Sequence, residues 1–151
     1  MILLFPNGDP FATGAIRYQY QPATPNEKTN RIFLRVEIAG YPTEAVVDTG
    51  APYVVLAPAI ARIAGLNSAA ALTRDRMLIR GMVLDGNIYR LNIKLLATLG
   101  DSLDVQATIF VPDREEFWGN FPSFIGLGGF LERIRFAFDP MTDTFYFGLL
   151  T

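Results

Sequence analysis

An acidic turn follows an apolar, β-branched run in residues 46–51, which read Val-Val-Asp-Thr-Gly-Ala. Residues 32–38 alternate well enough to form a strand, residues 40–42 read as a turn, and residues 44–47 read as the partner strand. A carboxylate on a tight turn directly after a buried strand is held rigidly and away from bulk water, where an acid can perform acid–base chemistry. The sequence therefore predicts a hairpin that ends in a catalytic Asp48.

The two residues after Asp48 suit the same role. The short hydroxyl of Thr49 can bond to backbone or to a neighbouring loop, and Gly50 permits close backbone approach because it has no Cβ. An Asp-Thr-Gly triplet alone is a weak signal, since most such triplets are ordinary turns satisfied by local side-chain bonds. Apolar segments on both sides, residues 45–47 and 51–56, favour a catalytic turn over an ordinary one.

In this context the triplet and its flanks resemble the active-site loop of retropepsin-like aspartic proteases. Residues 124–126, Phe-Ile-Gly, resemble the hydrophobic-hydrophobic-Gly signature that follows this loop in the family and opens a short helix. Residues 134–148 then read as a closing hairpin. The resemblance covers residues 31–149 and implies an all-β fold of the retropepsin-like acid protease type. We therefore expect a closed or partly closed barrel of hairpins with one or two short helices.

Composition and segment lengths favour a single all-β domain. Half of the 151 residues are hydrophobic, and thirteen glycines and ten prolines separate many short β-branched runs. We expect the protease domain in residues 31–151 and a short helix over residues 58–64, where a proline occupies the first turn. Residues 1–30 are rich in Pro, Gly, Asn and Thr and are predicted to be an N-terminal arm with a place in the dimer interface.

The two ends of the chain are apolar in residues 1–5 and 145–150. In the resembled family such end strands interleave between two subunits, so these segments are candidates for a shared sheet. The alternative is that each end pairs within its own subunit. An unpaired apolar edge strand promotes aggregation, so some partner is expected in either case.

A second hairpin is predicted in residues 77–93, with the dipeptide Asp85-Gly86 as its two-residue turn. In the resembled family this hairpin is the flap, which closes over bound peptide and excludes water, with Gly81 and Gly86 as bending points. The resemblance assigns substrate binding to Ala51, Gly81, Asp85 and Gly86. The alternative is an ordinary hairpin without a gating role.

The loop of residues 113–122 combines acidic side chains with Phe117, Trp118 and Phe121. These aromatics either line a substrate groove or cap the core. A single tryptophan more often anchors packing than recognition, so we favour the cap. The acidic side chains of the loop are expected to be a solvated surface.

Several chemistries are excluded by composition. The chain has no cysteine and no histidine, which removes disulfide scaffolds, zinc fingers, thiol proteases and Ser-His-Asp hydrolases. Carboxylates must carry the chemistry, and no metal or other cofactor is expected. A net charge of −2 with 13 scattered Lys and Arg argues against nucleic acid or an anionic membrane as partner. The start lacks a signal-peptide pattern and no apolar run has the length of a membrane span, so we expect a cytoplasmic protein.

One aspartate cannot perform aspartic-protease chemistry, which needs both a general base toward water and an acid toward the substrate. The chain holds a single Asp-Thr-Gly, so the second carboxylate must come from another copy in a C2 homodimer. Two carboxylates about 3 Å apart cannot both ionise, so the pair shares one proton. The predicted function is an aspartic endopeptidase that hydrolyses peptides or proteins with a water activated between the two Asp48 carboxylates, without a covalent intermediate.

Two positions depart from the pattern of the family. Where many retroviral enzymes carry an acid shortly after the active-site glycine the chain has Pro52, and where they carry Arg after the second motif it has Leu127. The acid and the arginine pair with each other in those relatives, so replacing both leaves no stranded charge. Pro52 also lacks an N–H that can hold substrate backbone, which favours the alternative of a catalytically silent protease-like β domain that binds peptides or dimerises. A third interpretation is a proteolytic domain cut from a longer precursor. The complete Asp-Thr-Gly favours the enzyme.

Overall fold

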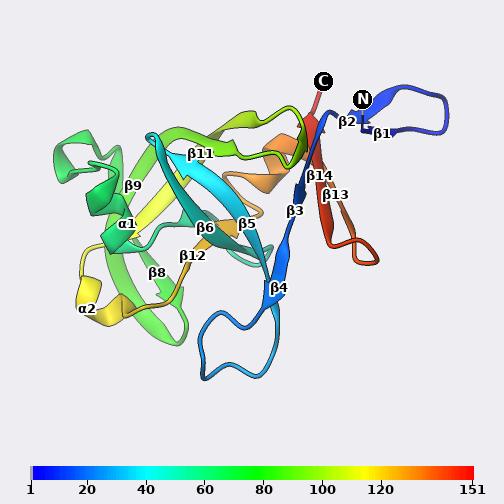
Figure 1. Ribbon diagram of the computed structural model, residues 1–151. Helices are drawn as coiled ribbons and strands as arrows, with labels where there is room; N and C mark the ends of the chain where they lie inside the picture. Colours follow the sequence, from blue (N-terminus) through cyan, green and yellow to red (C-terminus); the bar gives the residue numbers. More distant parts are fainter. Residues whose placement is uncertain (1) are drawn as a thin grey trace.

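The computed structural model describes residues 2–151 as a mostly β structure with two short α-helices (Figure 1). The N-terminal strands are β1 (Leu3–Leu4), β2 (Pro10–Ala12), β3 (Gly14–Arg17), β4 (Gln19–Gln21), β5 (Arg31–Ile38), β6 (Tyr41–Asp48) and β7 (Val54–Val55). The later strands are β8 (Thr73–Ile79), β9 (Met82–Leu95), β10 (Leu99–Gly100), β11 (Leu103–Pro112), β12 (Ser123–Gly126), β13 (Ile134–Asp139) and β14 (Thr144–Leu149). The helices are α1 (Pro58–Ile63) and α2 (Glu115–Trp118), with 3-10 turns η1 (Ser68–Ala70) and η2 (Leu131–Arg133).

The largest sheet has the strand order β4-β5-β6-β12-β7-β11-β9-β8. An additional antiparallel pairing of β5 with β9 joins strands from the two halves of this order, so the sheet curls into a ring. Apolar side chains such as Leu34, Ile93 and Ile109 are fully buried in the main core cluster. The predicted all-β fold with a partly closed barrel is confirmed, and the helix predicted over residues 58–64 is present as α1.

A second sheet joins the two ends of the chain in the order β10-β3-β14-β13. The closing hairpin predicted in residues 134–148 is confirmed as β13 and β14, and β14 also pairs with β3. Ile16 of β3 is only 1% exposed, so residues 14–17 of the predicted arm form part of the core. β1 pairs with β2 in a hairpin that projects beside the C-terminus in Figure 1. Both apolar ends therefore have strand partners within the subunit.

The predicted turn of the second hairpin is wrong. The chain reverses at Arg80 and Gly81, which join β8 to β9 with φ angles of 53° and 80°. Two consecutive residues in the left-handed region are typical of a type I′ turn, whose twist matches that of the strands. Asp85 and Gly86 instead lie inside β9, where they pair with β8 and where Gly86 also faces Pro112 of β11.

Gly86 has a packing role in place of the predicted turn role. A Cβ at this position would overlap the carbonyl oxygen of Val111 and the ring of Phe110. Glycine is therefore needed at this position for close approach of β11, a second common reason for glycine inside a strand.

The aromatic loop forms α2 and a core cap. Trp118 is 3% exposed, its indole N–H donates to the carbonyl oxygen of Phe121 at 2.6 Å, and it packs edge-on against Phe121 and Phe124. Phe121 is buried with it, as predicted for the cap, whereas Phe117 is 46% exposed. Among the described residues no helix is long and apolar enough to cross a membrane.

Candidate active site

The two sequence motifs lie side by side in the barrel. β12 runs parallel to β6, in a register that sets Ile125 opposite Val47 and Gly126 opposite Asp48. Val46 and Phe124 are buried beneath the pair, so the strand ends are anchored in the core. Asp48 is the last residue of β6 and is half-buried at the point where the chain leaves the sheet. The fold thus presents the carboxylate from a rigid strand end, as the sequence predicted.

The turn after β6 orients the carboxylate through its own backbone. The Gly50 N–H donates to Asp48 Oδ1 at 3.0 Å, and the Ala51 N–H donates to the Asp48 carbonyl oxygen at 3.1 Å. Within residues 2–151, Oδ2 of Asp48 has no hydrogen-bond donor. Thr49 and Gly50 are exposed, while Ala51 is buried at the base of the turn. The carboxylate is therefore fixed by one oxygen, and the other is available to water or substrate.

The glycines of the second motif allow the active-site loop to rest directly on it. A Cβ at Gly126 would overlap the carbonyl oxygens of Ala51 and Tyr53, and a Cβ at Gly128 would overlap that of Pro52. The motif therefore supports the turn that carries Asp48 by backbone contact, which explains why the signature ends in glycine.

Replacing Gly126 by alanine should remove activity as well as stability. The methyl group forces the loop that holds Asp48 away from β12, and such overpacking costs about 1–3 kcal/mol. Gly40→Ala is the matched control, because its Cβ meets nothing within 4 Å while its φ of +80° makes alanine strained there by about 1–2 kcal/mol. Thermal melts should show both variants destabilised. Cleavage assays should show loss only for Gly126→Ala, and equal activity of the two variants would contradict the supporting role.

Asp48 lines a cleft of about 170 Å³ between the catalytic turn and the end of the β8–β9 hairpin. Residues 50–52 form one wall and residues 77–80 form another. Val55, Phe124 and Arg31 complete the lining. The hairpin end therefore borders the carboxylate, which is the position predicted for the flap. A hairpin turning at residues 80 and 81 brings residues 77–80 to the cleft.

The structure brings some of the predicted site residues together and separates others. Ala51 lines the cleft beside Asp48, and Gly81 lies in the hairpin turn next to the lining residue Arg80. Asp85 and Gly86 do not line this cleft. The Asp85 carboxylate instead accepts a hydrogen bond from the Arg76 guanidinium at 2.7 Å across the β8–β9 pair, and this bond lowers the pKa of Asp85.

Arg31 and the side chains of residues 77–80 are cleft residues that the sequence did not reveal. For residues 77–80 the signal in the sequence is the dipeptide Arg80-Gly81, because a turn there predicts that these residues lie at the end of the hairpin. Nothing local to Arg31 marks it, because its place depends on how β5 sits beside β6 in the barrel.

A hydrogen bond connects the loop after Asp48 to the β8–β9 hairpin. The Tyr53 hydroxyl donates to Asp75 Oδ2 of β8 at 3.2 Å. Burial raises the pKa of Tyr53, and the bond to Asp75 raises it further, so the phenol keeps its proton and remains a donor at neutral pH. This hydrogen bond therefore fixes the loop after Asp48 relative to the β8–β9 hairpin.

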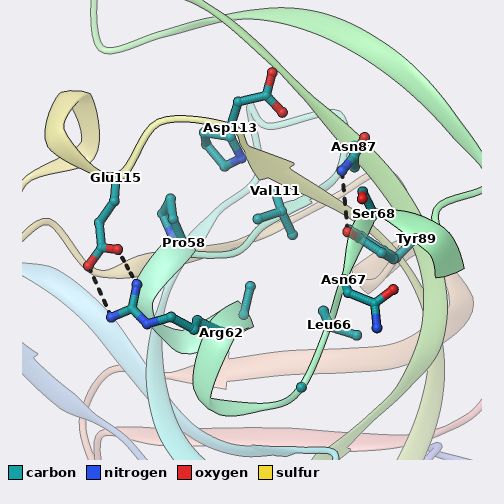
Figure 2. A pocket seen from close by; sticks show the side chains of 13 residues that line it. Pro58, Arg62, Leu66, Asn67, Ser68, Asn87, Tyr89, Val111, Asp113 and Glu115 are labelled. Atoms are coloured by element: carbon teal, nitrogen blue, oxygen red, sulfur yellow. Dashed lines mark hydrogen bonds and ion pairs between the residues drawn. The ribbon is translucent and has the colours of Figure 1, made fainter.

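A larger cavity of about 480 Å³ lies between α1, η1, β9 and β11 and shares no lining residue with the Asp48 cleft (Figure 2). Its two acids already have partners, because Glu115 pairs with Arg62 and Asp113 accepts two hydrogen bonds from Arg74. We therefore assign the chemistry to the smaller cleft, where the carboxylate has no cationic partner. Among the described residues, no group of three or more acidic side chains is placed to hold a metal ion.

Comparisons with known proteins bear on the family and the fold. Residues 34–111, just over half of the chain and including Asp48, match the family described as Aspartyl protease. The crystal structure of a retropepsin-like aspartic protease from Rickettsia conorii is similar over 91% of this chain and 94% of that chain, with a TM-score of 0.53 and 17% identity. No curated protein matches the chain. At this level of identity the structural likeness supports the fold.

Proposed function

The chain belongs to the aspartyl protease family, and from that premise we propose that it is a homodimeric endopeptidase that uses Asp48 from each subunit. One observation carries the proposal: Asp48 is the single acidic residue that lines the cleft in the part of the chain that the structure describes. Because peptide hydrolysis by carboxylates requires a base and an acid together, the second carboxylate comes from a second copy of the chain.

An exposed, uncharged surface beside Asp48 suits a two-fold contact. Thr49, Gly50 and Pro52 are exposed on the catalytic turn, and Leu127, directly after the second motif, is 42% exposed. The same patch meets itself in a C2 dimer, and an uncharged patch does so without opposing like charges. A contact across this surface brings the two Asp48 side chains toward the axis.

The proposed reaction uses only the paired carboxylates and water. The ionised carboxylate removes a proton from a water held between the two acids, and the protonated one donates its proton to the oxygen of the scissile carbonyl. The resulting tetrahedral intermediate has one added oxygen and no covalent bond to the protein. Its collapse breaks the C–N bond as a carboxyl group passes a proton to the leaving nitrogen. The β8–β9 hairpin covers the cleft and limits access of bulk water during these steps.

Inhibition and pH dependence test this proposal. A statine-type peptide, whose hydroxyl imitates the attacked carbonyl, should displace the water between the two acids and inhibit, whereas chelators and thiol or serine reagents should not.

Activity should be bell-shaped in pH with an acidic to mildly acidic optimum, because only the singly protonated pair is active. Cleavage of a peptide library, followed by mass spectrometry across pH, checks both expectations. Full loss with a chelator, or activity that rises steadily to alkaline pH, would overturn the mechanism.

Pro52 affects the expected strength of this inhibition. The residue lacks an N–H with which to hold the backbone of a substrate or inhibitor. A statine-type inhibitor should therefore bind this protein more weakly than it binds family members that have an N–H at this position. Titration of the inhibitor against the wild-type protein and Pro52→Ala compares the two cases, and Pro52→Ala should bind it more tightly.

A further inference from the structure

We propose that the cleft selects substrates that carry an acidic side chain beside the scissile bond, through the guanidinium groups of Arg31 and Arg80. This inference rests on the proposed function, because it names the substrate class of the same site. Both arginines line the cleft that holds Asp48, Arg31 from the start of β5 and Arg80 from the turn of the β8–β9 hairpin.

The positive charges of these two arginines are not neutralised within the described part of the subunit. The ion pairs there engage four other arginines, Arg62, Arg74, Arg76 and Arg114. Asp48, the acid that shares the cleft, forms no ion pair with either guanidinium. In the proposed dimer each subunit adds two guanidinium groups, while the proton-sharing Asp48 pair carries one negative charge. The cleft therefore has an excess of positive charge.

Arg31 has a donor that lacks an acceptor. Its Nε is buried and has no hydrogen-bond partner among the described residues, although the rest of the side chain is partly exposed at the cleft. A buried N–H left unpaired is unfavourable, and a charged donor gains most from a charged acceptor. A carboxylate of a substrate in the cleft meets the partly exposed guanidinium, whose planar group suits two parallel bonds to it.

Arg80 is held in place without using its hydrogen-bond donors. Its guanidinium carbon lies 3.6 Å from the centroid of the Phe121 ring, within the range of a cation–π contact. Stacking of this kind covers the face of the guanidinium and leaves its N–H edge free. Phe121 is itself fixed by Trp118 and Phe124, and Phe124 lines the same cleft. The flap turn thus presents a positioned cation at the cleft.

Matched peptides that differ only in Glu or Gln next to the scissile bond test the inference. The two side chains have nearly the same size, so the ratio of their kcat/KM values reports charge recognition. The wild-type dimer should prefer the Glu peptide by about tenfold or more, as expected for one charged hydrogen-bonded contact. The preference should fall as salt is raised, because screening weakens exposed charge pairs.

Variants identify the residues responsible. Arg31→Gln and Arg80→Gln should each lower the Glu-to-Gln ratio, and the double variant should bring it close to one. Arg35→Gln is the matched control, because Arg35 is exposed on the same strand as Arg31 and does not line the cleft. This control should keep both the ratio and the activity. Arg80→Glu should reverse the preference toward a peptide with Lys at the same position, a gain that misfolding cannot produce.

Binding to Asp48→Asn separates this inference from the proposed function. The Glu peptide should bind this variant more tightly than the Gln peptide, and Arg31→Gln or Arg80→Gln in the same background should remove the difference. A wild-type protein that cleaves both peptides equally would overturn the acidic preference and leave the protease function standing. A protein that cleaves neither peptide but binds the Glu form selectively would support the charge recognition and overturn the protease function. Equal binding of the two peptides to Asp48→Asn would also overturn the inference.

Discussion

Replacing Asp48 by asparagine is expected to abolish peptide cleavage while leaving the fold intact. The amide oxygen can still accept the hydrogen bond from the Gly50 N–H, so the shape of the turn is preserved. The change removes the base and the shared proton from both subunits at once, and positioned acid–base catalysis typically contributes about 10²–10⁴-fold. A loss of at least this size should be seen when wild type and variant are compared on one peptide library.

Asp104→Asn is a suitable control for this experiment. Asp104 is an exposed residue of β11 that forms no ion pair or side-chain hydrogen bond within the described residues, so its amide variant should retain full activity. Circular dichroism and thermal melts should show that all three proteins are folded. Cleavage by Asp48→Asn at the wild-type rate would place catalysis elsewhere. A wild-type protein that binds peptides without cleaving them would support the binding-module alternative.

Mixing wild-type and Asp48→Asn subunits should lower activity more than dilution does. If one active site needs a carboxylate from each subunit, mixed dimers are inactive. An equal mixture that is unfolded and refolded together should then have about one quarter of the activity of wild-type protein at the same total concentration. Independent subunits would give about one half. A parallel mixture with Asp104→Asn should retain full activity, which controls for losses during refolding.

Sedimentation provides an independent check of the subunit requirement. Analytical ultracentrifugation under assay conditions should show a dimer at concentrations where the protein is active. A fully active monomer, or activity of the mixture near one half, would contradict a site shared between two subunits.

The sequence by itself determined the features that rest on short-range patterns. The apolar run before Asp48 predicted a buried strand that ends in a carboxylate, and β6 has this form. The closing hairpin was predicted for the same reason, since alternation and turn residues act over a few positions. The Phe-Ile-Gly motif was identified by its resemblance to the signature of the family, and it forms β12. Trp118 was predicted as a core anchor because a single tryptophan more often anchors packing than recognition, and it is buried.

Only the tertiary structure decided where the β8–β9 hairpin turns. The dipeptides Arg80-Gly81 and Asp85-Gly86 both lie between apolar β-rich runs, and the second carries the stronger local turn signal. Residue 86 has to be glycine because β11 lies too close for a side chain at this position. The proximity of β11 follows only from the assembled sheet and not from the local sequence. The position of the turn then determines which side chains reach Asp48.

Long-range strand pairing also decided the remaining features of the site and the role of the first residues. β3 enters the core because it pairs with β14, a partner from the other end of the chain, which no local pattern can reveal. Arg31 lies at the cleft because β5 pairs antiparallel with β6, which brings the start of β5 beside the end of β6 that carries Asp48. Local patterns specify which segments form strands, whereas the side chains that meet depend on contacts between segments far apart in sequence. The two arginines that line the cleft are therefore placed there by the tertiary structure and not by a local sequence pattern.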